Sequence, residues 1–259
     1  MTFKKLMTPI SDFLDVLGEH ILFFASVVRA TFQNRFEGRE FLIQLSQVAW
    51  RSLPTTLTAG IFTGAIMAVQ FHLQIKDFGA ASALGGLSTS GTLREVGPIL
   101  VAFMLAGKVG AYTSAELGTM RVTDQIEAIR CLGVDPISFL VVPRFLAVII
   151  SSVLLLSFGL VISVTGGVVA SYLAADLDPS QYLLMIPQYV GSIAIKLAVI
   201  KAIVFGILMG HLCCANGYWT KGGTQGVGVS VRKTAVQSMV AIVLSDFAVS
   251  WIVSVLTQQ

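Results

Sequence analysis

The sequence predicts an all-α membrane protein with about five transmembrane helices. Its 259 residues are 55% hydrophobic and only 12% charged, whereas an ordinary soluble domain carries about 25% charged residues. Apolar runs recur between Leu53 and Leu256, and several reach the roughly 20 residues that a helix needs to cross a hydrocarbon core. Basic residues are concentrated in alternate connecting segments, as in multi-pass proteins. We therefore expect the bilayer to surround most of the chain.

Interfacial helices are expected before the first transmembrane helix. In residues 13–32, apolar side chains recur at helical spacing between charged ones, which is typical of an amphipathic helix lying along the membrane surface. A second such helix is expected at residues 40–50, before Pro54 marks the entry into the bilayer; an ordinary packed helix is the alternative. The chain then divides into N-terminal interfacial helices, 1–52, and a transmembrane domain, 53–259.

The five expected transmembrane helices differ in polarity. The first two contain polar residues such as His72 and Lys108 and the small-residue pair Gly60 and Gly64, which favour packing against protein over contact with lipid. The third is the most hydrophobic. The expected limits are 53–75, 96–117, 139–173, 186–214 and 234–256, with Lys76, Asp77, Arg94 and Glu95 in the first connection and a glycine-rich loop, 222–228, before the fifth helix.

The distribution of basic residues predicts the orientation. With five spans, 12 of the 17 Lys and Arg residues fall on the side of the N-terminus, while the other side holds only Lys76 and Arg94. Lys108, Lys196 and Lys201 fall within spans. By the positive-inside rule, the N-terminus is expected in the cytoplasm and the C-terminus on the opposite side.

Several function classes are disfavoured by the composition. The net charge of +3 comes without a dense basic run, so nucleic acid is not an expected partner. Cys131, Cys213 and Cys214 lack the spacing of metal ligands or of a disulfide framework. The sequence contains no G-x-x-x-x-G-K-[ST] motif and no hydrolase motif, so we expect neither ATPase activity nor any other catalysis, and no metal or cofactor.

A short cytoplasmic helix is expected between the second and third spans, within residues 120–136. Asp124 suits the N-cap with Glu127 at the third helical position, and Gly133 suits the left-handed residue after the helix. The apolar edge of this helix would consist of Ile126, Ile129 and Leu132. Such a stiff, capped helix could receive force from a cytoplasmic motor, or it could simply pack on its own subunit; spacing alone leaves both open.

Two charged residues lie about halfway along the fourth and fifth spans. Lys201 and Asp246 would each cost about 2.5–3.5 kcal/mol if isolated in the bilayer, so we expect them to pair. A stabilising ion pair is the simpler interpretation and a role in conformational switching the other.

Glu95, with Arg94, is expected at the outer mouth of the second span, where it could hold a polar headgroup while acyl chains lie on apolar neighbours. The alternative is a solvated pair between these two charges. The apolar wall, chosen on helical spacing around Glu95, consists of Met67, Phe71, Val96, Ile99 and Phe103.

Several runs of residues resemble the Mla permease (MlaE-like) family, over nearly the whole chain beyond its first fifth. They are Leu93-Arg-Glu-Val-Gly-Pro98, Ala106-Gly-Lys-Val-Gly110, Ala115-Glu-Leu-Gly-Thr-Met-Arg-Val-Thr-Asp-Gln-Ile-Glu-Ala-Ile129, Leu132-Gly-Val-Asp-Pro136, Val142-Pro-Arg-Phe-Leu146, Asn216-Gly-Tyr218, Gly222-Gly-Thr-Gln-Gly-Val-Gly228 and Leu244-Ser-Asp-Phe247.

This resemblance implies a non-catalytic inner-membrane subunit of an ABC-type system that moves phospholipid between inner and outer membranes. It implies a homodimer that works with a cytoplasmic ATPase dimer, a periplasmic ring of MCE-domain proteins and, in some members, a small cytoplasmic STAS-type protein. It also implies that Glu95 lines a lipid pocket at the dimer interface. The helix at 124–132 would be the coupling helix, contacting the ATPase through Asp124, Gln125, Ile126, Glu127, Ile129, Leu132 and Asp135.

Two other function classes remain as alternatives. A secondary transporter or proton-coupled channel could use Lys201, Asp246 and Lys108 within the membrane. A purely structural membrane anchor is the third hypothesis. The energy source separates the first two, because only the ABC-type subunit requires a separate ATPase.

Overall fold

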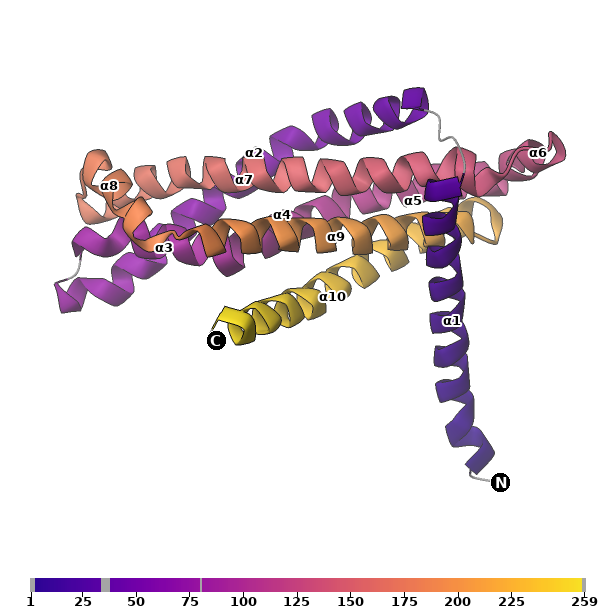
Figure 1. The fold of residues 1–259 in the computed structure, drawn as a ribbon, viewed down its shortest axis with the longest axis horizontal. Helices are drawn as coiled ribbons and strands as arrows, with labels where there is room; N and C mark the ends of the chain where they lie inside the picture. The colour runs from indigo at the N-terminus through magenta and orange to yellow at the C-terminus, as the bar shows by residue number, and fades with distance from the viewer. Residues whose placement is uncertain (1–2, 34–37, 80, 258–259) are drawn as a thin grey trace.

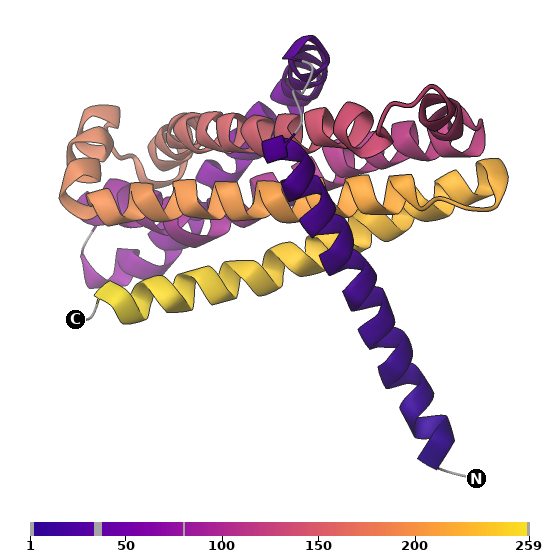
Figure 2. The same cartoon turned by 45° about the vertical axis from the view of Figure 1, so that its right-hand side comes forward.

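The computed structural model describes residues 3–33, 38–79 and 81–257, and every regular element in these ranges is a helix (Figure 1). Five segments are long and apolar enough to span a membrane: Gly38–Phe78, Leu84–Val122, Ile137–Ala175, Ser192–Tyr218 and Gly223–Leu256. They share one long axis in both views (Figures 1 and 2). The predicted all-α membrane fold with about five spans is therefore confirmed.

Helix α1, Phe3–Gln33, crosses the transmembrane helices at a steep angle and projects beyond them (Figures 1 and 2). Its inward side chains include Phe23 and Val27, whereas Leu17 and Ile21 of the expected apolar stripe are exposed. This arrangement suits a helix lying in the plane of the membrane surface with its apolar side in lipid. The first residue of that stripe, at position 13, lies outside the residues whose side chains are described.

An aromatic cluster fastens α1 to helix α9, Ser192–Tyr218. His20 Nδ1 lies 3.1 Å from His211 Nε2, and the Phe23 and His20 rings meet the Trp219 ring edge-on at 5.1 Å between centroids. Burial lowers the pKa of His20, and the nearby charge of Lys233 lowers it further, although Glu19 raises it. The neutral form of His20 is therefore favoured at this contact.

Helix α2 runs without interruption from Gly38 to Ile75, with Pro54 inside it. The prediction of a separate interfacial helix at residues 40–50 was wrong. Residue 52, where the expected interfacial part of the chain ends, lies within α2. Pro54 has no N–H to donate to the carbonyl of Trp50, but membrane helices tolerate proline where neighbouring groups compensate. Here Lys108 donates to the adjacent carbonyl of Arg51.

Small residues set the close packing of α2 against helix α7, Val142–Ala175. A Cβ atom added at Gly60 would lie 2.3 Å from the carbonyl oxygen of Gly159, and one added at Gly64 would lie 1.8 Å from that of Ser163. The two backbones therefore approach at a distance that only glycine allows, as in other membrane helix pairs.

The second span begins earlier than expected. After turns at Lys76–Phe78 and Ala81–Ala83, it comprises α3, Leu84–Gly91, then α4, Gly97–Leu105, and α5, Ala111–Val122, joined by π-helical turns at Thr92–Val96 and Ala106–Gly110. Arg94 and Glu95 consequently lie on the second span, and their expected position in the first connection was wrong.

The remaining helices follow the predicted order with two corrections. Helix α8, Pro179–Tyr189, is separate from α9, so the fourth span begins at Ser192 instead of residue 186. Asp178 caps α8 by accepting from the Ser180 backbone N–H at 2.7 Å, and bonds from Ser180 lower the pKa of this carboxyl. Helix α10, Gly223–Thr257, includes most of the expected glycine-rich loop. The connection is confined to residues 219–222, and the two glycines where it meets α10, Gly222 and Gly223, both have positive φ.

Candidate functional site

Three charged side chains from three spans meet at Lys201. Its Nζ lies 2.8 Å from Glu95 Oε2 on the second span, 2.8 Å from Asp246 Oδ1 on α10, and 2.6 Å from the backbone oxygen of Arg94. The ammonium donates hydrogen bonds to the Arg94 carbonyl and to Glu95 Oε2, and its contact with Asp246 is an ion pair. Lys201 is completely buried, with a side-chain exposure of 0%. The structure thus brings together three predicted residues that the sequence placed in two separate sites.

The local sequence explains why Arg94 offers its backbone oxygen. In a regular α-helix, the carbonyl of residue 94 would accept from the N–H of residue 98, but residue 98 is a proline and has none. The π-helical turn Thr92–Val96 immediately precedes it, and such turns often occur at functional sites. The Arg94 carbonyl is therefore available to Lys201. The side chain of Arg94 is exposed, and Glu95 pairs with Lys201 rather than with Arg94.

Glu95 occupies the accessible edge of this cluster. Its side chain is 49% exposed, while that of Asp246 is only 7% exposed. Ser250 Oγ on α10 donates to the Glu95 carboxylate at 3.1 Å. With two carboxylates and one ammonium, the cluster carries a net charge of about −1 when all three groups are ionised. The partly exposed carboxylate can therefore accept hydrogen bonds from a further polar group.

The residues expected to form an apolar wall lie on both sides of the cluster. Met67 and Phe71 of α2 approach Gly91, one turn before Glu95, since a Cβ atom there would lie 3.0–3.2 Å from their side chains. Phe103 lines a recess of about 270 Å³ with residues of α10. Val96 and Ile99 are half-buried on the same span. Apolar surface therefore continues along α2, α4 and α10 away from Glu95.

The short helix α6, Gln125–Cys131, projects from the end of the molecule opposite α3 and α8 (Figure 1). Its expected cap is absent: Asp124 has a φ of 58° and its side chain makes no capping hydrogen bond. Glu127 instead pairs with Arg121 and with Arg130, the latter at 3.0 Å. A residue with positive φ turns the chain sharply, so Asp124 belongs to the turn between α5 and α6.

The predicted coupling residues have different surroundings. Ile126 is fully buried in its own chain and Ile129 is half-buried, whereas Leu132 is 80% exposed. Gln125 is exposed, and Asp135 accepts from the Ser138 N–H at 3.1 Å, which caps the start of the third span. The surface that α6 offers to another molecule is therefore centred on Leu132.

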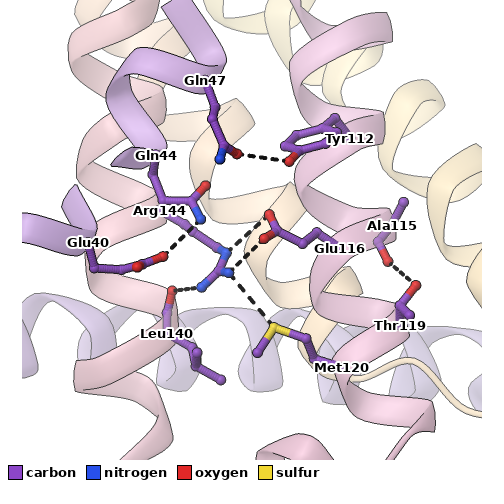
Figure 3. A network of polar contacts seen from close by, with 10 residues as sticks. All are labelled: Glu40, Gln44, Gln47, Tyr112, Ala115, Glu116, Thr119, Met120, Leu140 and Arg144. Carbon is purple, nitrogen blue, oxygen red and sulfur yellow. Dashed lines mark hydrogen bonds and ion pairs between the residues drawn. The ribbon is translucent and has the colours of Figure 1, made fainter. Parts of the chain in front are cut away.

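A buried ion pair that the sequence analysis did not identify supports this end of the molecule. Arg144 Nη2 of α7 lies 2.9 Å from Glu116 Oε1 of α5, and Arg144 also donates to the carbonyl of Leu140 at 2.9 Å (Figure 3). Nearby, Tyr112 donates to Gln47 Oε1 at 3.0 Å. The arginine within Val-Pro-Arg-Phe-Leu and the glutamate within Ala-Glu-Leu-Gly were visible in the sequence, but nothing there indicated that they meet.

The fold and the charged cluster define a multi-pass membrane protein with a charged site between its spans and a short helix projecting from one end. Comparison with known proteins places it more narrowly. The family model described as Permease MlaE matches residues 41–252. The chain therefore belongs to the MlaE permease family, as its motifs suggested.

Named relatives agree with this assignment. The chain is 32% identical over 238 residues to a probable ABC transporter permease protein of Rickettsia conorii, covering 92% of each chain. It is 28% identical over 250 residues to the intermembrane phospholipid transport system permease protein MlaE of Haemophilus influenzae, covering 92% of this chain and 96% of that one. It is 32% identical over 233 residues to the chloroplastic protein TRIGALACTOSYLDIACYLGLYCEROL 1 of Arabidopsis thaliana, covering 86% and 64%.

Proposed function

We propose that this permease moves phospholipid between inner and outer membranes and that Glu95 contacts the lipid headgroup. The observation that carries this proposal is the half-exposed Glu95 carboxylate, held by buried Lys201 and bordered by apolar surface. A phospholipid presents both chemistries, a polar headgroup and apolar chains. The name of the Haemophilus influenzae relative, a phospholipid transport permease, supports the same substrate.

The permease acts as a homodimer with Glu95 near the interface. Only 11% of the 18-residue apolar segment of the fifth span is buried, compared with 33–50% of the corresponding segment in the other four spans. Exposed apolar side chains alone could face lipid, but Glu95 and Ser250 lie beside this face and a carboxylate is poorly accommodated among acyl chains. A second copy that covers α10 would enclose the carboxylate in a shared cavity.

Energy comes from a cytoplasmic ABC-type ATPase dimer that docks on α6 of each subunit, with Leu132 at the contact. The chain sits in the inner membrane with its N-terminus and α6 in the cytoplasm and its C-terminus in the periplasm, where a ring of MCE-domain proteins receives or delivers lipid. A STAS-type protein can complete the cytoplasmic side. The uneven distribution of basic residues supports this orientation.

A proton-coupled transporter is the rival function, because a buried lysine between two carboxylates also suits a proton relay. A proton-coupled transporter would require no ATPase and would assign no coupling role to α6.

The proposal is tested by reversing the charge at Glu95 in cells that depend on this gene. Glu95→Lys places a second cation beside Lys201, and we expect phospholipid to accumulate in the outer leaflet of the outer membrane, measured by accessibility to an external lipid-modifying enzyme. Asp77→Asn, at an exposed acidic residue of the hairpin between the first two spans, is the control. Unchanged lipid asymmetry in Glu95→Lys cells with normal protein levels would contradict the proposal and favour a structural anchor.

A further inference from the structure

A basic recess lies between α2 and the second span, separate from the Glu95 cluster. It has a volume of about 210 Å³. Its polar lining residues are Gln47, Arg51, Ser52, Lys108 and Tyr112. Both charged residues among them are cations, and no carboxylate of the described residues lines the recess. Arg51 is exposed and Lys108 is half-buried, so an anion from outside the recess can reach both cations.

Neither cation has an acidic partner within the described ranges 3–33, 38–79 and 81–257. The ion pairs found there centre on Glu127, Arg144 and Lys201. Lys108 donates to the backbone carbonyl of Arg51, and the Arg51 guanidinium lies 5.7 Å from the centre of the Tyr112 ring. These contacts orient both side chains but use few of their N–H groups, of which lysine has three and arginine five.

The polar groups around the two cations provide a further hydrogen-bond donor. Tyr112 donates its hydroxyl to Gln47 Oε1 at 3.0 Å (Figure 3). This bond directs the oxygen of the Gln47 amide toward the tyrosine and leaves its NH₂ group as a further donor. A ligand with several acceptor oxygens would therefore satisfy the recess better than chloride.

The position of the recess along α2 and the second span corresponds to the depth of the lipid headgroups in a bilayer. Arg51 lies 24 residues before the end of α2 at Ile75, and Lys108 lies 24 residues after the start of α3 at Leu84. At 1.5 Å per residue, both are about 36 Å from the hairpin that joins the two helices. A hydrocarbon core is about 30 Å thick and headgroups extend it to about 40–45 Å. Arg51 and Lys108 thus reach the headgroup layer on the side of α6.

We propose that this recess binds a phosphate group, with Arg51 and Lys108 as its charge partners, and that the phosphate belongs to an anionic phospholipid. Arginine suits this role because its planar guanidinium can bond two phosphate oxygens at once. Basic recesses between transmembrane helices on the cytoplasmic side are suited to anionic headgroups. The assignment to the cytoplasmic leaflet rests on the orientation proposed above; the phosphate site does not.

The test titrates the purified full-length protein, in a neutral detergent, with phosphatidylglycerol and separately with inorganic phosphate, and follows thermal unfolding. Lys108→Met and Arg51→Gln should each raise the half-saturating concentration about tenfold, because each removes a charge-assisted hydrogen bond. Lys108→Arg should bind nearly as wild type does. Lys196→Met, which removes an exposed cation of α9, should leave the titration unchanged.

The two probes distinguish the sources of the phosphate. Stabilisation by phosphatidylglycerol that depends on Arg51 and Lys108 supports a headgroup site, and the same dependence for inorganic phosphate supports binding of the free anion. The proposal is overturned if wild type responds to neither probe, or if Lys108→Met and Arg51→Gln respond like Lys196→Met to both. Loss of the effect in Glu95→Gln would instead assign the bound lipid to the Glu95 cluster.

Discussion

At the scale of single residues, Lys201 holds the candidate site together. Its single positive charge balances one of the two carboxylates beside it. The two carboxylates lie at a similar depth in the membrane, because Glu95 is 11 residues from the start of α3 and Asp246 is 10 residues from Leu256. Both positions are about 15–17 Å along their helices, close to half of a hydrocarbon core. Without the ammonium, two negative charges would face each other in a medium that stabilises neither.

Replacing Lys201 with methionine should therefore destabilise the protein by about 3–5 kcal/mol, because it leaves buried Asp246 without its partner. Lys196→Met is the matched control, since Lys196 lies on the same helix but is exposed. Thermal unfolding of both variants in detergent provides the measurement. Equal stability of the two variants would show that Lys201 is not needed to neutralise the carboxylates.

The sequence indicated part of this cluster. The cost of an isolated charge in the bilayer is enough to predict that Lys201 and Asp246 pair. Glu95 was placed with Arg94 in the connection before the second span, since the expected limits of that span begin at residue 96. In a membrane helix, neighbouring groups can satisfy a carbonyl that a proline leaves without its N–H partner. Here Pro98 leaves the carbonyl of Arg94 free, and the ammonium of Lys201 donates to it. The second span therefore continues through Pro98, and the carbonyl of Arg94 is part of the site.

At the scale of elements, α6 shows how far periodicity can define a functional surface. Of the predicted apolar edge, Ile126 and Ile129 lie on α6, whereas Leu132 is the residue after its end at Cys131. A helical pattern does not tell which neighbour covers each residue. Ile126 is buried by its own chain and Leu132 is exposed. The capping argument failed because Asp124 belongs to the tight turn before α6, while Glu127 forms ion pairs with Arg121 and Arg130.

Leu132→Asp should consequently prevent co-purification of the ATPase while leaving the permease folded, because Leu132 lies at the accessible surface. Leu184→Asp, at an exposed leucine of α8 near the other end of the molecule, should retain the ATPase. Ile126→Asp should instead lower the stability of the permease itself, since it buries a charge. Co-purification of the ATPase with Leu132→Asp at the wild-type level would refute the role of α6 in coupling.

At the scale of the whole molecule, the predicted number and order of spans agree with the structure, while several limits do not. Composition and the length of apolar runs determine how often the chain can cross a bilayer. They do not determine where a helix ends, because Pro54 and the glycines of α10 are accommodated inside helices. Side-chain pairs between different spans, such as Arg144 with Glu116, can be known only from the way the helices pack.

The proposed homodimer predicts that two copies meet through the exposed face of α10. With Cys131 replaced by serine to remove the exposed native thiol, Phe247→Cys should form a covalent dimer on mild oxidation in membranes. Phe158→Cys, at an exposed position of α7, should not. Dimer yields are read from a non-reducing gel. Comparable yields at the two positions would argue against an interface through α10.

The central claim is that a separate ATPase drives lipid past Glu95. It is tested most directly by reconstituting the permease in vesicles with the proposed ATPase and MCE-domain partners and measuring transfer of labelled phospholipid. The account predicts transfer that requires ATP hydrolysis and falls at least tenfold in Glu95→Gln, with the complex intact. Transfer that proceeds without the ATPase under a proton gradient, or that is unaffected by Glu95→Gln, would contradict it.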